Sequence, residues 1–236
     1  MQYKIFTSES RGKADHGWLK TAYSFSFSSY YNPDRINFGA LRVLNDDFIA
    51  KGMGFGEHPH QNMEIITIPL RGDLAHKDSL GNASVIKQGD IQIMSAGSGI
   101  YHSEKNNSTT QDVELFQIWI FPKLEEITPR YEQKTIDTVS MKNDLLRVVS
   151  PFSEPNAVVI NQDAYLYLGN WDLAHQQKYR LQSPQNGLFM LVIEGAVSFQ
   201  EKSLQRRDAI EVSDFETITF QALQADTRVL FIEVPL

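Results

Sequence analysis

The chain has 236 residues, which is enough for one large β domain or for two smaller domains. Lysine and arginine total 22 against 29 aspartates and glutamates, and the net charge of −7 argues against a nucleic-acid-binding protein, which needs a basic surface. The chain contains no cysteine, so disulfides, cysteine nucleophiles and metal sites built on thiolates are excluded.

No apolar run approaches the roughly 18 residues that a membrane-spanning helix needs. The first residues, MQYKIFTSESRGKADHG, lack the apolar stretch that directs secretion. We therefore expect a cytoplasmic protein that does not enter a membrane.

Short apolar runs recur along the whole chain, and few stretches have the 3.6-residue period of a helix. Turn-forming residues such as Asn45-Asp46 and Gln88-Gly89-Asp90 separate these runs. Many short strands with turns between them predict an all-β sandwich or barrel. The expected strands are, in chain order, Ala40–Leu44, Glu64–Leu70, Ser84–Lys87, Ile91–Met94, Val113–Phe121, Ala157–Ile160, Ala164–Leu168, Leu188–Ile193, Ala209–Val212, Thr217–Phe220 and Arg228–Val234.

The composition predicts two domains, 1–136 and 137–236. The first holds five of the six histidines and eleven of the fourteen glycines, so we expect the chemistry there. The polar segment 122–141, which contains two prolines, is expected to connect the domains. A weak internal echo between 66–73 and 191–197 is consistent with a duplicated architecture.

The densest chemical signal is a pair of histidine motifs in the first domain. On a strand, alternate side chains share one face, so His58 and His60 lie on one side, and Glu64 continues the same alternation. His102 and Glu104 repeat the arrangement. Two such pairs on facing strands converge on one point, and neutral imidazole is the commonest metal ligand in proteins.

Three imidazoles and one carboxylate suit Fe(II), Ni(II), Mn(II), Cu(II), Co(II) or Zn(II). Four protein ligands leave a position for water or substrate, which is typical of a reactive site rather than a structural one. A single His-x-His motif also occurs by chance, but two pairs in one small domain, both beside glycine turns, favour the metal interpretation.

A resemblance to a known family supports this interpretation. Two segments combine glycine, histidine and a further polar residue at fixed spacing: Gly52-x5-His58-x-His60-x3-Glu64 and Gly99-x2-His102-x3-Asn106. They resemble the two motifs of the cupins, which are small antiparallel β-barrels with a metal inside. Matches through most of 8–131 are similar to the pirin family of bicupins, including Arg11, Gly17-Trp18-Leu19, Phe25-Ser26-Phe27, Phe38-Gly39, Leu41-Arg42-Val43, Asn45-Asp46-Asp47, Gly54-Phe55-Gly56, His58-Pro59-His60, Met63-Glu64, Gly97–Glu104 and Ile118-Trp119.

The resemblance implies two antiparallel, jelly-roll-like β-barrels, with a metal site in 1–136 and none in 137–236. It places the ligands on four residues, and iron comes first among the divalent metals that could bind. Glu64, a ligand in many other cupins, is not one in pirins; we expect it behind the ligands, orienting an imidazole. The implied ligands are His58, His60, His102 and Glu104.

For function, the resemblance implies a quercetinase, which opens a flavonol ring with O2 and releases carbon monoxide. Glu104 is then both a ligand and the proton acceptor. The expected partners are a small aromatic substrate and O2, and a monomer is expected because two fused cupins can replace a cupin dimer. The alternative is a metal-binding regulatory pirin that acts through a protein partner; a cupin isomerase or a thiol dioxygenase is a third interpretation.

Overall fold

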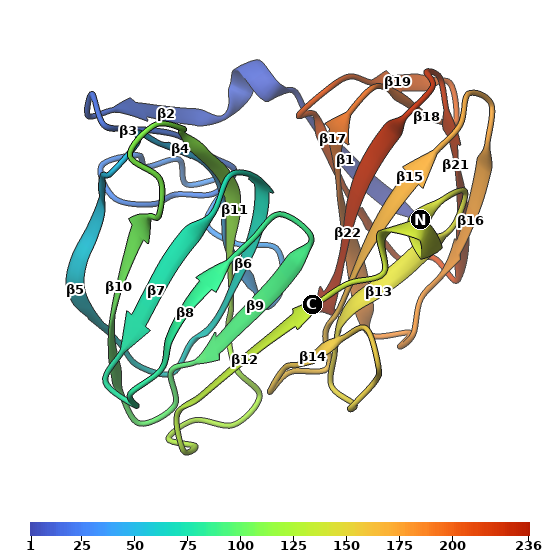
Figure 1. Ribbon diagram of the computed structural model, residues 1–236. Coiled ribbons are helices and arrows are strands. Elements are labelled where there is room, and N and C mark those ends of the chain that lie inside the picture. The colour runs from blue at the N-terminus through green and yellow to red at the C-terminus, as the bar shows by residue number, and fades with distance from the viewer. The chain divides into compact units, whose positions relative to one another are not determined.

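The computed structural model describes all residues, 1–236, and its regular secondary structure is almost entirely β-strand (Figure 1). The chain forms two compact units. The N-terminal unit comprises residues 12–136 and 152–162, and the C-terminal unit comprises 1–11, 137–151 and 163–236. The expected all-β class is therefore confirmed.

The two units do not follow a single cut after residue 136. The first residues form β1 (Gln2–Phe6), which pairs with β20 (Ala209–Ser213) in the C-terminal unit. The segment 152–162 belongs to the N-terminal unit, where the ammonium group of Lys134 donates hydrogen bonds to the carbonyl oxygens of Glu154 and Ala157. Backbone pairing attaches β1, and hydrogen bonds from the half-buried Lys134 help to attach 152–162. Buried apolar side chains such as Phe6 and Val158 also anchor the two segments.

The strands of the N-terminal unit are Gly12–Asp15 (β2), Leu19–Tyr23 (β3), Leu41–Ile49 (β4), Gly54–His60 (β5), Glu64–Arg71 (β6), Leu74–Asp78 (β7), Ala83–Ile86 (β8), Asp90–Ser95 (β9), Ile100–Asn106 (β10), Val113–Ile120 (β11), Arg130–Thr135 (β12) and Val158–Val159 (β14). Two antiparallel sheets form the barrel. The smaller sheet has the order β5-β10-β7-β8, and the larger has the order β12-β9-β6-β11-β4-β3-β2. Inward-facing apolar side chains such as Leu74 and Leu115 fill the space between the strands.

The C-terminal unit repeats this plan with a four-stranded sheet in the order β16-β21-β18-β19 and a larger sheet that contains the order β1-β20-β17-β22-β15-β13. Its core includes Trp171 and several phenylalanines, all fully buried. The remaining elements are η1 (Ser8–Ser10), β13 (Leu145–Ser150), β15 (Tyr165–Trp171), β16 (Gln176–Arg180), β17 (Asn186–Glu194), β18 (Val197–Phe199), β19 (Lys202–Leu204), β21 (Thr217–Ala222), β22 (Thr227–Pro235) and η2 (Thr138–Met141).

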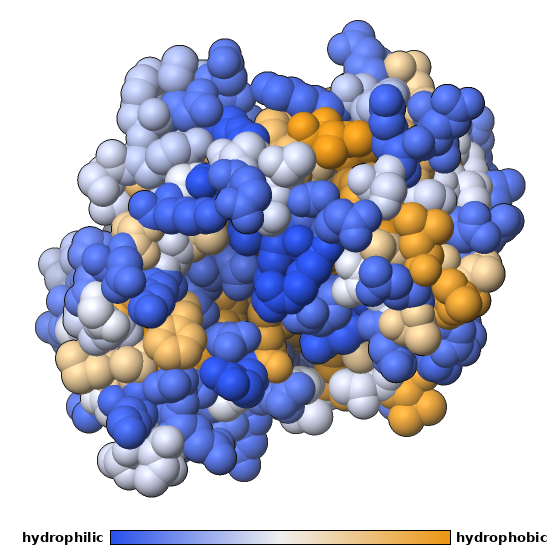
Figure 2. Space-filling view, turned by 90° about the horizontal axis from the view of Figure 1, so that it is seen from above, coloured by the Kyte–Doolittle hydropathy of each residue, from blue (hydrophilic) through white to orange (hydrophobic).

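The helical content is limited to η1 and η2, and no helix has the length and apolar character needed to cross a membrane. On the face drawn in Figure 2, hydrophilic side chains predominate and apolar side chains appear as separate patches.

Two local expectations are wrong. The Asn45-Asp46 pair was expected as a turn but lies in the middle of β4, where Asn45 is buried. The segment 122–141 was expected as a connection, but it contains β12, which pairs with β9. Hydrogen bonds from Gln133 and Thr135 to the carboxylate of Asp90 secure this polar edge strand, so its sequence lacks the apolar pattern of a core strand.

Candidate metal centre

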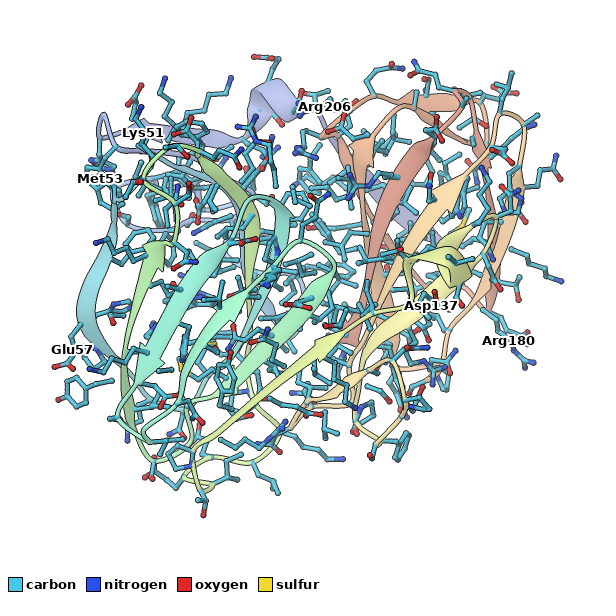
Figure 3. All side chains as sticks on the ribbon, in the orientation of Figure 1. Lys51, Met53, Glu57, Asp137, Arg180 and Arg206 are labelled. Carbon is cyan, nitrogen blue, oxygen red and sulfur yellow. The ribbon has the colours of Figure 1, made fainter.

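Strands β5 and β10 carry the two histidine motifs and pair antiparallel, with His102 opposite His58. Along β5 the side chains alternate, so that His58 and His60 point inward while Glu57 projects outward to solvent (Figure 3). Along β10 the same alternation buries His102 and Glu104. The period-two pattern in the sequence is therefore the physical cause of the convergence.

The three imidazoles of His58, His60 and His102, called the histidine cluster below, face one another closely. One ring nitrogen from each lies within 4.8 Å of the others. The ring centroids of His58 and His102 are 4.4 Å apart, and each of these rings is 4.9 Å from that of His60. This spacing allows one ion to contact all three rings.

The hydrogen bonds of the cluster fit a bound metal. The Nδ1 atom of His58 is 2.8 Å from the carbonyl oxygen of Gly56; donation to this acceptor assigns the proton to Nδ1 and leaves the Nε2 lone pair for an ion. Both ring nitrogens of His102 are buried and have no hydrogen-bond partner. Buried polar atoms are normally paired, so an ion that takes one of these nitrogens removes an unfavourable feature.

Burial also sets the protonation of two rings of the cluster, His60 and His102. It lowers the pKa of His60 to about 4, and the nearby His58 ring contributes in the same direction. It lowers the pKa of His102 to about 2, with further contributions from His58, His60 and His76. At neutral pH these rings are uncharged, which is the form that binds a metal.

The carboxylate of Glu104 lies at the edge of the histidine cluster. Burial raises its pKa above the usual range. The side-chain amide of Gln117 donates a hydrogen bond of 2.8 Å to its Oε2, and the indole nitrogen of Trp119 donates to the amide oxygen of Gln117 at 3.3 Å. Oxygen or nitrogen atoms of Glu104, His102 and His76 lie within 4.8 Å of one another, so His102 links the carboxylate to the cluster.

Behind His102 lies a buried pair on β7, His76 and Asp78. Strand β7 forms a hairpin with β8. His76 Nε2 is 3.2 Å from the carboxylate of Asp78, and its ring lies 5.3 Å from the ring of His102. Backbone and side-chain donors from Leu80 and Asn82 hold Asp78, and side-chain hydrogen bonds from Asn82 and His76 lower its pKa against the effect of burial.

Glu64 lies apart from this group. Its Oε2 accepts hydrogen bonds from the hydroxyl of Ser95 at 2.8 Å and from the backbone nitrogen of Asn161 at 3.2 Å, and neither partner is an imidazole. Asn62, with φ of 48°, interrupts the alternation between β5 and β6, and β6 belongs to the other sheet. The expected shared face of Glu64 and the histidine pair therefore ends at this turn.

A cavity of about 260 Å³ opens onto His58, His60 and Glu104. This is near the lower end of the volumes of small-molecule sites, about 300 Å³. The other side chains that line it combine apolar and aromatic groups with buried polar groups: Leu19, Thr21, Tyr23, Phe27, Asn45, Asp47, Phe55, Gln117 and Trp119. The sequence pattern does not predict which residues line the cavity, although a polar residue such as Gln117 within an apolar strand is a usable signal.

Two units of antiparallel sheets, of which the N-terminal unit has convergent histidines beside a cavity, are the features of a two-domain cupin. The sequence model of the pirin family, Pirin, matches residues 5–120, and the model of the quercetinase C-terminal cupin domain matches residues 147–234. The chain belongs to the pirin family.

Similar proteins cover nearly the whole chain. A quercetin 2,3-dioxygenase of Escherichia coli strain K12 is 41% identical over 226 residues, which cover 95% of each chain. A pirin-like protein of Caulobacter vibrioides is 39% identical over 220 residues, which cover 93% of this chain and 94% of the relative. The crystal structure of the bacterial pirin YhhW of Escherichia coli in complex with nickel(II) superposes with a TM-score of 0.93 at 37% identity and covers 99% of each chain.

Proposed function

We propose that His58, His60, His102 and Glu104 bind one divalent transition metal, with iron as the occupant. The close approach of the three imidazoles and the unpartnered nitrogens of His102 support this ligand set. The similar pirin from Escherichia coli forms a complex with nickel(II), which supports the binding of a divalent ion by this chain. The affinity of such a ligand set for different divalent ions follows a general order that is set by the metals themselves. The supply of each metal therefore contributes to which ion occupies the site.

We further propose that the protein is a dioxygenase that opens a flavonol such as quercetin with O2. The observation that carries this proposal is the cavity, which places aromatic and apolar walls directly beside His58 and His60. Phe27, Phe55 and Trp119 line the cavity and offer aromatic surface that a flat substrate ring can contact. The quercetin 2,3-dioxygenase name of the 41% identical relative points to the same substrate class.

Each residue has a distinct part in this reaction. A bound metal supplies a Lewis acid that lowers the pKa of the flavonol 3-hydroxyl. Glu104, with its carboxylate in a buried setting, accepts the hydroxyl proton, and Gln117 fixes the position of that carboxylate. The aromatic walls orient the substrate and exclude water. The overall reaction consumes one O2 and yields one carbon monoxide and one ester of two hydroxybenzoic acids.

The test is aerobic turnover of quercetin by the iron-loaded protein, with O2 uptake and carbon monoxide measured together. We expect a ratio of one to one, and at least a hundredfold slower turnover in a His58→Ala, His60→Ala double variant. His16→Ala is the matched control, because His16 is exposed and lies outside the cluster in the same unit; it should retain full turnover.

Bound metal without turnover, for every metal that suits the ligand set, would contradict the enzyme and favour the regulatory alternative. A Glu104→Gln variant that kept both its metal and full turnover would contradict Glu104 as the proton acceptor.

A further inference from the structure

One wall of the cavity is polar although it is deeply buried. Thr21 on β3 and Asn45 and Asp47 on β4 line the cavity and are only 6%, 3% and 5% exposed. None of these residues is a member of the histidine cluster, and the metal proposal assigns no role to them. A buried polar wall beside an open cavity therefore requires an explanation.

The strand register explains how these side chains come together. Asn45 and Asp47 are two residues apart on β4 and so share one face. Across the neighbouring strand, Thr21 pairs with Asp47 and Tyr23 pairs with Asn45. On the other side, Gln117 of β11 pairs with Asn45. The result is a contiguous polar surface that spans three adjacent strands and faces the cavity.

This surface offers mainly hydrogen-bond acceptors. The Oδ1 atom of Asn45 is buried and has no hydrogen-bond partner. The residues that line the cavity include neither lysine nor arginine, so Asp47 has no cation there. Burial raises the pKa of Asp47 to about 7 against a hydrogen bond from Thr21, which lowers it, and the nearby carboxylates of Asp46 and Glu104 add to the rise.

The ligand that satisfies such a surface presents hydrogen-bond donors and no negative charge. Adjacent phenolic hydroxyls are donors on a flat ring, and hydrogen bonds that involve a charged group are about twice as strong as neutral ones. A substrate that placed a carboxylate at this wall would instead meet Asp47 without a lysine or arginine to compensate.

We propose that Thr21, Asn45 and Asp47 form a subsite that binds the pair of adjacent hydroxyls on the catechol ring of a flavonol, with Asp47 as the principal acceptor. This inference rests on the proposed function for the class of substrate. It adds the residues that distinguish one flavonol from another, because a site that hydrogen-bonds a hydroxyl rejects the analogue that lacks it.

The test compares two flavonols by calorimetric titration of the metal-loaded protein with O2 excluded, so that binding is measured without turnover. Quercetin carries the catechol pair, and galangin lacks both of these hydroxyls. We expect the wild-type protein to bind quercetin at least tenfold more tightly than galangin. We expect Asp47→Asn to reduce this ratio to below about threefold, and Asn45→Ala to reduce it by a smaller factor.

Asp46→Asn is the matched control, since it removes the same charge from the adjacent residue of β4, which does not line the cavity. It should keep the wild-type ratio. Equal affinity of the wild-type protein for both flavonols, or an unchanged ratio in Asp47→Asn, would overturn the subsite and leave the proposed reaction intact. Failure of both flavonols to bind would instead overturn the proposed substrate class and the subsite together.

Discussion

At the residue scale, burial controls the charge of the groups that meet at the cavity. It lowers the pKa of His60 to about 4 and that of His102 to about 2, so that protons do not compete with a metal at neutral pH. It has the opposite effect on acids and raises the pKa of Asp47 to about 7. The same environment thus favours neutral ligands and makes a charged Asp47 costly.

This cost predicts that Asp47→Asn stabilises the metal-free protein at high pH. Between the unfolded pKa of 3.8 and the folded pKa of about 7, the folded state binds more protons at this residue than the unfolded state does, so the stability of the wild-type protein falls as pH rises through this range. The gain in unfolding free energy in the variant should be about 2–3 kcal/mol larger at pH 8 than at pH 5.

Guanidinium denaturation of both proteins in the presence of a chelator measures this difference. An identical gain at the two pH values would show that Asp47 does not carry the expected penalty. A gain that grows with pH would indicate that the polar wall is kept at the expense of stability, as is common for residues with a functional role.

At the scale of single elements, the close approach of β5 and β10 positions the histidine cluster. A Cβ added at Gly54 would meet the carbonyl oxygen of Glu104 and lie 2.5 Å from the Cα of Lys105. A Cβ added at Gly56 would have nothing within 4 Å. Two glycines on one strand therefore differ sharply in their tolerance of a methyl group.

We predict that Gly54→Ala separates the two strands, lowers metal affinity at least tenfold and destabilises the protein by about 1–3 kcal/mol. Gly56→Ala should change stability by less than about 0.5 kcal/mol and leave metal affinity unchanged. Metal titration and denaturation of the two variants check this. Equal effects at the two positions would contradict the close packing of β5 on β10.

The elements also show which features the sequence can predict. The His-x-His alternation correctly places His58 and His60 on one face, because period-two alternation is a local property of a strand. His102 joins them through the pairing of β10 with β5, which is not local. The polar wall of the cavity depends on the register of three neighbouring strands, which the local sequence does not reveal. Asn45-Asp46 resembles a turn because Asn and Asp are common in turns, although both residues lie within β4. Glu64 is misplaced for the same reason: a turn between two sheets ends the alternation.

At the scale of the whole molecule, two units with similar sheets differ in their chemistry. The N-terminal unit holds the histidine cluster, whereas the C-terminal unit contains only His175, which is 3.2 Å from the side-chain oxygen of Gln177 and packs beside Trp171. The family relationship covers both units, so the second barrel is an integral part of the protein without a second cluster. This asymmetry predicts one metal ion per chain.

The most direct test of the central claim is the metal content per chain after reconstitution with Fe(II) under anaerobic conditions and removal of unbound metal. We predict about one ion per chain in the wild-type protein and in the His175→Ala control, and less than about a tenth of an ion in the His58→Ala, His60→Ala variant. Absence of bound iron in the wild-type protein, or equal iron content in the double variant, would contradict the assignment of the histidine cluster as a metal site.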